Sequence, residues 1–167
     1  MSFYTDVILK DPRFGSINVC KDMQMLEPGM RAATLALISD AAVAGHELRV
    51  METMRSSARQ THLYNQGFTQ LRTVGVHKFG LAVDLGLFVN GVYQEDGEKY
   101  AFLVDLGKKH GLVSGIDWGT PQLKHSFHDW DHLQRVPVCR QHDLFNLSWY
   151  PPETYDPFAD QKAVIGA

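Results

Sequence analysis

Hydrophobic and polar residues alternate along two stretches of this chain, and each alternation predicts a half-buried β-strand. The first stretch is 47–54 and the second is 81–85. Because successive side chains of a strand face opposite sides, Ala82 and Asp84 share one face of the second strand. The other face is apolar, which predicts core. The face that carries the carboxylate beside a small alanine leaves room for a bound group.

Three further stretches show the helical spacing of hydrophobic residues, and each is followed by a glycine at the position that commonly ends a helix. They are 31–44 before Gly45, 57–66 before Gly67, and 98–110 before Gly111. In the first helix, Leu35, Ile38 and Ala42 share one face, which we expect to be buried.

The remaining segments predict turns and loops. Asn90-Gly91 within 88–93 is typical of a β-hairpin turn, and 112–119 predicts a short strand and a turn. Residues 1–30 contain several turn-forming pairs, so we expect them to be irregular. Proline, aspartate and aromatic residues are frequent in 137–167, which predicts an irregular tail wrapped over the domain.

Composition places the chain among ordinary globular proteins. Its 167 residues, 44% hydrophobic and 21% charged, predict a single domain over 1–167 with a core of about 26–136. The formal net charge of −3 and the lack of a basic run argue against a nucleic-acid partner. Cys20 and Cys139 lack metal-ligand spacing, so we expect two reduced, buried thiols.

The first residues carry no basic region followed by an apolar stretch, and no segment has the length of a membrane span. We therefore expect no signal peptide and no membrane partner. The protein would be made in a cytoplasm, and any export would need help from outside this chain.

His77 and Asp84 are the first candidate metal ligands. Gly80 lies between them and can turn the chain, which brings the imidazole back toward the carboxylate. A histidine and a carboxylate held together form two thirds of a facial metal site. We expect the third ligand to be His132.

The segment before His132 supplies candidates for a general base. Asp129 precedes His132 by three residues, and in an extended or turned chain its carboxylate would face the open coordination position. Asp131 is a rival for this role. An alternative is a helical zinc pair of His128 and His132, although Trp130 and Asp131 between them disfavour a helix. The remaining histidines are expected at the surface or in packing: His46, His62, His110, His125 and His142.

Arg55 stands between the expected strand 47–54 and the helix that follows it. Functional side chains often project from such a junction. Judged from the residues alone, a surface arginine making one salt bridge is the favoured interpretation. The alternative is a fixed cationic donor to a substrate carbonyl or carboxylate.

In this order, these segments resemble the peptidase family of VanY-type D-Ala-D-Ala carboxypeptidases and phage L-alanyl-D-glutamate endopeptidases. The catalytic fold of that family is shared with the zinc-containing domain of Hedgehog proteins. The similarity spans about 26–136 and rests on four motifs. Residues 54–67 are similar to Y-R-S-x-x-x-Q-x-x-L-Y-x-x-G, 77–84 match H-x-x-G-x-A-x-D, 117–119 resemble a reduced W-G-G-x-W, and 129–134 are similar to D-x-P-H-F-Q/E.

The resemblance implies an α+β fold with a small antiparallel sheet flanked by helices, as in Hedgehog and DD-peptidase domains. It also implies that His77, Asp84 and His132 bind zinc, that Asp129 is the general base, and that Arg55 stabilises the developing oxyanion.

Three positions depart from the family pattern. Gly75 stands where the family usually has a serine, so a hydrogen bond near the substrate is missing or comes from another group such as Thr73. Asp131 replaces the proline before the last histidine, which adds a second carboxylate. Met54 replaces a common tyrosine, a change we expect to affect packing only.

The expected function is therefore zinc-dependent cleavage of peptidoglycan stem peptides. We expect a monomeric phage endolysin that cuts between L-Ala and D-Glu and reaches the wall from the host cytoplasm through a holin. The alternatives are a D-Ala-D-Ala carboxypeptidase, a virion protein with the same chemistry, and a non-catalytic zinc-binding domain.

Overall fold

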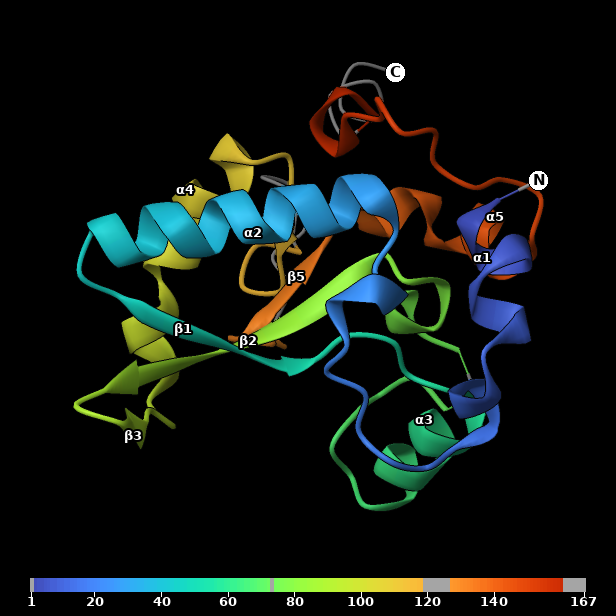
Figure 1. The fold of residues 1–167 in the computed structure, drawn as a ribbon, viewed down its shortest axis with the longest axis horizontal. Helices are drawn as coiled ribbons and strands as arrows, with labels where there is room; N and C mark the ends of the chain where they lie inside the picture. Colours follow the sequence, from blue (N-terminus) through green and yellow to red (C-terminus); the bar gives the residue numbers. More distant parts are fainter. Residues whose placement is uncertain (1, 73, 119–126, 161–167) are drawn as a thin grey trace.

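The sheet is the centre of the fold. The computed structural model describes residues 2–72, 74–118 and 127–160. Within them, antiparallel strands pair in the order β1-β2-β5-β4, and β3 pairs with the end of β2 (Figure 1). The strands are β1 (Glu47–Glu52), β2 (Ala82–Val89), β3 (Val92–Tyr93), β4 (Val113–Ser114) and β5 (His132–Gln134). The expected α+β class with an antiparallel sheet is confirmed.

Helices surround this sheet. The α-helices are α1 (Phe3–Asp6), α2 (Pro28–Val43), α3 (Ser57–Asn65), α4 (Phe102–Lys109) and α5 (Gln141–Phe145). The 3₁₀-helices are η1 (Ile8–Lys10), η2 (Pro12–Gly15), η3 (Met23–Met25), η4 (Val76–Phe79), η5 (Gly97–Tyr100) and η6 (Val138–Arg140). The three helices expected from the sequence are present, and the hairpin turn has positive φ at Asn90 and Gly91, as expected.

The two ends of the described chain are more regular than the sequence predicted. Residues 1–30 were expected to be irregular, yet α1 and three 3₁₀-helices form there. Short polar side chains explain the difference, because Ser2, Asp11 and Asp22 each accept a backbone N–H at the start of a helix. The expected irregular tail likewise contains η6 and α5.

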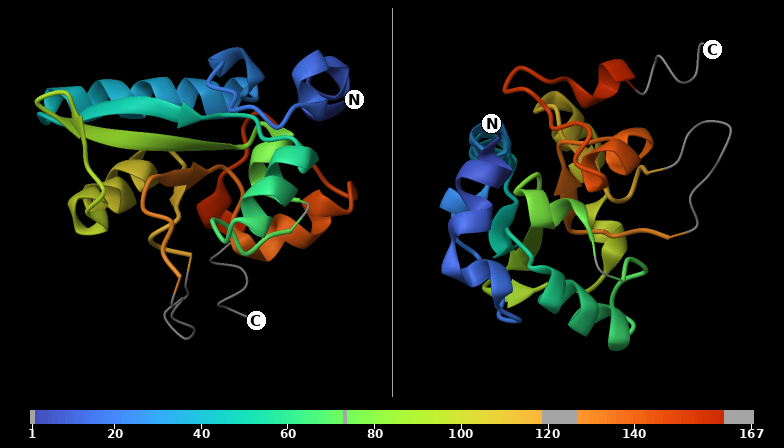
Figure 2. Two further views of the ribbon diagram at one scale, coloured as in Figure 1. Left: turned by 90° about the horizontal axis from the view of Figure 1, so that it is seen from below. Right: turned by 90° about the vertical axis from the view of Figure 1, so that its right-hand side faces the viewer.

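One face of the sheet carries the main core. Helices α2 and α4 contribute side chains to it, together with Val83 and Leu85 of β2 and Leu133 of β5. The views in Figures 1 and 2 show α2 lying along β1 and β2. The opposite face of the sheet, where the side chains of Asp84 and His132 lie, is left for the site described below.

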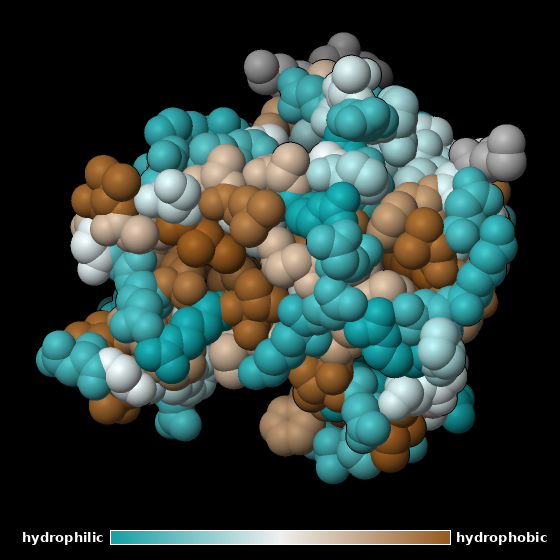
Figure 3. All heavy atoms as spheres, in the orientation of Figure 1, coloured by the Kyte–Doolittle hydropathy of each residue, from teal (hydrophilic) through white to brown (hydrophobic). Residues whose placement is uncertain are grey.

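Helix α2 buries a different face from the one predicted. Its buried residues are Met30, Thr34, Leu37 and Ala41, whereas Leu35 is 55% exposed. Helix α2 is apolar almost all the way round, so hydrophobic spacing alone does not select the inner face. On this side of the molecule, hydrophobic residues reach the surface over α2, interspersed with hydrophilic ones (Figure 3).

A second cluster joins the N-terminal segment to the tail. Tyr4 and Ile8 pack there with Phe79 of η4 and Leu144 of α5. The expectation that both cysteines are buried is wrong for Cys139, which is exposed, and right for Cys20. Among the described residues, no helix is both long and apolar enough to cross a membrane.

Candidate metal centre and active-site cleft

Two neighbouring strands bring together the first two candidate ligands. Asp84 of β2 and His132 of β5 are paired directly across the antiparallel ladder. Residues paired in this way place their side chains on the same face. The next pair, Val83 and Leu133, faces the main core, so Asp84 and His132 lie on the opposite face.

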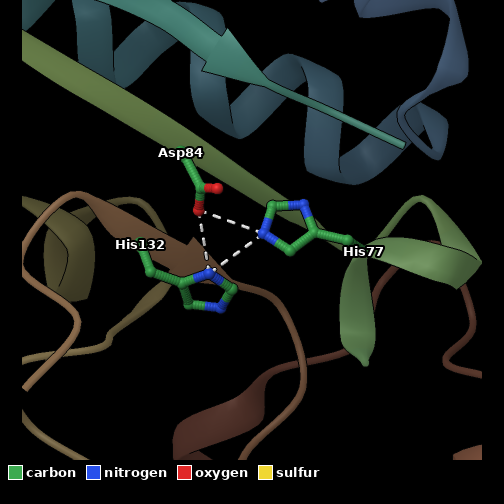
Figure 4. A group of neighbouring side chains, drawn as sticks. All are labelled: His77, Asp84 and His132. Atoms are coloured by element: carbon green, nitrogen blue, oxygen red, sulfur yellow. Dashed lines mark hydrogen bonds and ion pairs between the residues drawn. The ribbon is translucent and has the colours of Figure 1, made fainter. Parts of the chain in front are cut away.

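The third candidate ligand, His77, comes from η4 just before β2. Gly80 ends η4 with φ +70°, and a Cβ there would lie 2.7 Å from the carbonyl oxygen of Met25. The turn brings His77 Nε2 to 3.0 Å from Asp84 Oδ1 and 3.1 Å from His132 Nδ1. His132 Nδ1 lies 3.0 Å from the same oxygen, so the three side chains converge on one point (Figure 4).

Hydrogen bonds on the far side of each ring select the nitrogens that face this point. His77 Nδ1 donates to the carbonyl oxygen of Thr53 at 2.6 Å, which leaves the Nε2 lone pair directed at Asp84. His132 Nε2 donates to Gln134 Oε1 at 2.9 Å, which leaves the Nδ1 lone pair directed inward. The Gln134 amide is itself oriented because its Nε2 donates to the Val136 carbonyl.

The electrostatics favour an ionised carboxylate at this point. With no ion bound, burial acts to raise the pKa of Asp84, but a positive charge on His77 and a hydrogen bond from protonated His132 hold that pKa well below its ordinary range. For His132, burial acts to lower the pKa, and the hydrogen bond and charge of Asp84 outweigh it and raise the pKa. The cluster therefore attracts positive charge.

A divalent metal ion fits these residues. One carboxylate and two neutral imidazoles are a common donor set for catalytic zinc. Bonds of about 2.0–2.1 Å around a tetrahedral ion separate the ligand atoms by about 3.3 Å, close to the 3.0–3.1 Å found here. When both imidazoles are neutral, the two lone pairs selected above and the Asp84 oxygen all point toward one position, which suits a positive ion there.

Arg55 lies beside this cluster and is not the surface residue that was favoured from its sequence context. Its side chain is 14% exposed, and its Nη2 donates to Asp84 Oδ2 at 2.9 Å and to Glu52 Oε2 at 2.6 Å. Arg55 Nε donates to the same Glu52 oxygen at 3.0 Å. Arg55 Nη1 contacts Gln60 Oε1 at 3.4 Å, which is the longest contact made by the three guanidinium nitrogens.

Sequence reasoning missed Glu52, and a β-bulge explains why. The ladder between β1 and β2 pairs Val50 with Leu85 and then Glu52 with Asp84, so Met51 is an extra residue. In an unbroken register Glu52 would pair with Val83 and face the main core. The bulge turns the Glu52 carboxylate to the side of Asp84, where it also binds Arg59 Nε. Its three-residue spacing from Arg55 was the available signal.

The two candidate bases occupy different positions. Asp129 lines the cleft together with His77, His132 and Arg55, whereas Asp131 is not among the described residues that line it. Burial raises the pKa of Asp129, while the charges of His132, His77 and Arg55 act to lower it. Asp131 is half-buried, and its backbone carbonyl accepts from the N–H of Leu85 in β2.

Side-chain amides and aromatic rings both line the cleft. It is lined by Arg55, Gln60, Thr69, Gln70, Leu71, Gly75, Val76, His77, Trp118, Phe127, Asp129, His132, Gln134, Val138 and Gln141. Trp118 stacks on Phe127 and meets the His132 ring edge-on at 5.3 Å. At Gly75, the departure from the family serine, a Cβ would lie 3.2 Å from Gln60 Oε1, so the Gln60 amide fills the adjacent space.

The segment that leads into β5 does not form the helix that a His128–His132 zinc pair would need. His128 and His132 are not on a helix, because β5 begins at His132, and the Trp130 ring lies edge-on to His128. Thr73, Gly119, His125 and residues 161–167 lie outside the described residues, so the predictions that involve them stay predictions.

The fold is that of the VanY-type D,D-peptidases and their endopeptidase relatives, as the resemblance implied. The L-Ala D-Glu endopeptidase ChiX of Serratia marcescens superposes with a TM-score of 0.57 at 20% identity, over 72% of this chain and 86% of that one. The D,D-pentapeptidase VanY of a VanB-type resistance cassette, in complex with Zn(II), gives a TM-score of 0.51 at 15% identity, over 72% and 78%.

A third structure of this kind is DacB from Streptococcus pneumoniae D39, with a TM-score of 0.50 and 19% identity over 74% of this chain and 73% of that one. No protein-family model matches this sequence. At these identities the likeness establishes the fold alone.

Proposed function

We propose that this protein is a zinc-dependent peptidase that hydrolyses peptidoglycan stem peptides. The observation that carries the proposal is the convergence of His77 Nε2, Asp84 Oδ1 and His132 Nδ1 within 3.1 Å of one another, beside a cleft that His77 and His132 line. A structural zinc site would need neither a second carboxylate nor a guanidinium lining the cleft beside it. The presence of Asp129 and Arg55 there therefore favours an enzyme over a non-catalytic zinc domain.

The roles of the residues follow from their positions. His77, Asp84 and His132 would hold the ion, which when bound polarises a carbonyl and makes water a better nucleophile. Asp129 would accept the proton of the attacking water and then pass it to the leaving amine. Arg55, fixed by Glu52 and Asp84, would donate from Nη1 to the oxygen that gains charge. The stacked rings of Trp118 and Phe127 would exclude water from the peptide.

We propose cleavage between L-Ala and D-Glu. Two observations support this choice: the resemblance to phage L-alanyl-D-glutamate endopeptidases, and the higher TM-score of ChiX, described as an L-Ala D-Glu endopeptidase, than of VanY. A phage endolysin that passes from the host cytoplasm to the wall through a holin, acting as a monomer, is the biological setting we propose on the same resemblance.

Mass analysis of digested peptidoglycan tests this proposal directly. New peptides beginning with D-Glu indicate the endopeptidase, and released D-Ala indicates a D,D-carboxypeptidase. If purified wall incubated with the zinc-loaded protein yields neither product, the proposed function is wrong.

A further inference from the structure

A segment near the N-terminus, residues 16–22, lies against the junction between β1 and α3 (Figure 1). We call it the N-terminal strap. Three residues at or near the junction donate hydrogen bonds to its backbone carbonyls. The Thr53 N–H donates to Cys20 at 2.7 Å, Arg59 Nη1 donates to Ile17 at 3.3 Å, and the Ser56 hydroxyl donates to Ser16.

Thr53 is the residue through which the strap reaches the candidate metal centre. The Thr53 side chain is fully buried, and its hydroxyl lies 3.0 Å from the carbonyl oxygen of Asp22 and 3.1 Å from that of Cys20. The Thr53 backbone carbonyl accepts the Nδ1–H of His77 at 2.6 Å. In return, the carbonyl of His77 accepts the backbone N–H of Arg55 at 3.3 Å.

We propose that Thr53 is a positioning residue, and that the N-terminal strap fixes the orientation of the His77 ring through it. This proposal rests on the zinc function proposed above and adds a residue outside the ligand set. A hydrogen bond to Nδ1 determines both the tautomer and the rotation of a metal-binding histidine. The Thr53 carbonyl provides that bond, and it stays in place because the N–H and the hydroxyl of the same residue are both held by the strap.

The strap lies before residue 26, where the similarity to the peptidase family begins. The four motifs therefore do not account for its contacts. The consequence is specific. When the Thr53 hydroxyl is lost, the 53–55 segment keeps its backbone bonds but gains freedom to shift. The Nε2 lone pair of His77 is then less firmly aimed at the point it shares with Asp84 and His132.

The test is Thr53→Val, which keeps the shape of the side chain and removes the hydroxyl. We expect zinc to bind about tenfold more weakly, as measured by competition with a chromogenic chelator. Thr53→Ser keeps the hydroxyl and should restore the wild-type dissociation constant. Thr53→Ala also lacks the hydroxyl and provides the measurement if the valine variant does not fold.

Thr34→Val is the matched control. Thr34 is also fully buried, but its hydroxyl donates to the Met30 carbonyl at 2.8 Å within α2, on the core side of the sheet. The Thr34→Val substitution should lower the free energy of unfolding by about 1 kcal/mol and leave zinc binding unchanged. The proposal is overturned if Thr53→Val loses stability to the same extent and keeps wild-type zinc affinity.

A readout that needs no metal separates this proposal from the proposed function. In the metal-free protein, the Nδ1–H proton of His77 should exchange slowly with water by NMR, and Thr53→Val should accelerate that exchange at least tenfold while Thr34→Val does not. If the wild-type protein binds no zinc but shows this difference, the zinc function fails and the strap proposal stands. Equal exchange in all three proteins contradicts the strap proposal, whatever the zinc result.

Discussion

Asp129 and Asp131 lie two residues apart, and single substitutions distinguish them. Because Asp129 lines the cleft and Asp131 does not, Asp129→Asn should lower kcat on the order of a hundredfold or more while zinc content stays near one ion per chain. Asp131→Asn should keep most of the turnover. Peptide-release assays and metal analysis on both variants provide the comparison, and the reverse ranking would transfer the role of base to Asp131.

The same residue Asp131 predicts a dependence of stability on pH. Burial, together with the charges of Asp84 and Asp129, raises its pKa to about 7. An unfolded aspartate has a pKa near about 3.9, so between roughly pH 4 and pH 7 the folded chain binds more protons than the unfolded chain. The free energy of unfolding of the metal-free protein should therefore fall as the pH rises through that window.

Asp131→Asn removes this effect. In urea denaturation of chelator-treated protein, the variant should be more stable than the wild type at pH 8, by at most about 4 kcal/mol, and nearly equal to it at pH 4. Asp117→Asn changes an exposed carboxylate, so its free energy of unfolding should stay close to that of the wild type at both pH values. A constant offset between variant and wild type at the two pH values would show that burial of the Asp131 charge does not cause the difference.

At the scale of elements, the sequence predicted which stretches form helices and strands better than which faces they bury. The strand 47–54, the hairpin and three helices were predicted because alternation, helical spacing and terminal glycines are local signals. The inner face of α2 was not, because this helix is apolar around most of its circumference. The bulge at Met51 was not predicted either, because it depends on pairing with a strand thirty residues further along the chain.

In the candidate site, too, local sequence patterns predicted some residues and missed others. His77, Asp84, His132 and Asp129 belong to short motifs, so the sequence alone was enough to predict them as site residues. Thr53 supports His77 from a separate segment, and the position of Glu52 depends on the pairing of β1 with β2. Such contacts leave no periodic pattern in the sequence.

The reassigned face of α2 is testable with two leucines on one helix. Leu37→Ala empties a fully buried position and should lower the free energy of unfolding by about 2–4 kcal/mol. Leu35→Ala changes a side chain that is 55% exposed and should cost about 0.5 kcal/mol or less. Urea unfolding curves measure both, and similar losses would mean that the helix is rotated from the orientation described here.

At the scale of the whole molecule, removal of the metal should affect stability as well as catalysis. Chelation should abolish wall hydrolysis, and zinc should restore it. Zinc at about a hundred times its dissociation constant should stabilise the wild-type fold by about 2.7 kcal/mol, seen as a higher Tm. His132→Ala should lose this response. His110→Ala, which removes a histidine paired with Asp40 outside the site, should keep it.

The paired position of Asp84 and His132 has a topological consequence. The two residues are 48 positions apart in sequence and face each other across adjacent strands. An ion shared by them links two strands that are distant in sequence, much as a disulfide between these strands would, but the link forms only when folding brings the ligands together. Refolding started in chelator should be slower than refolding started in zinc, if that link forms before the rate-limiting step.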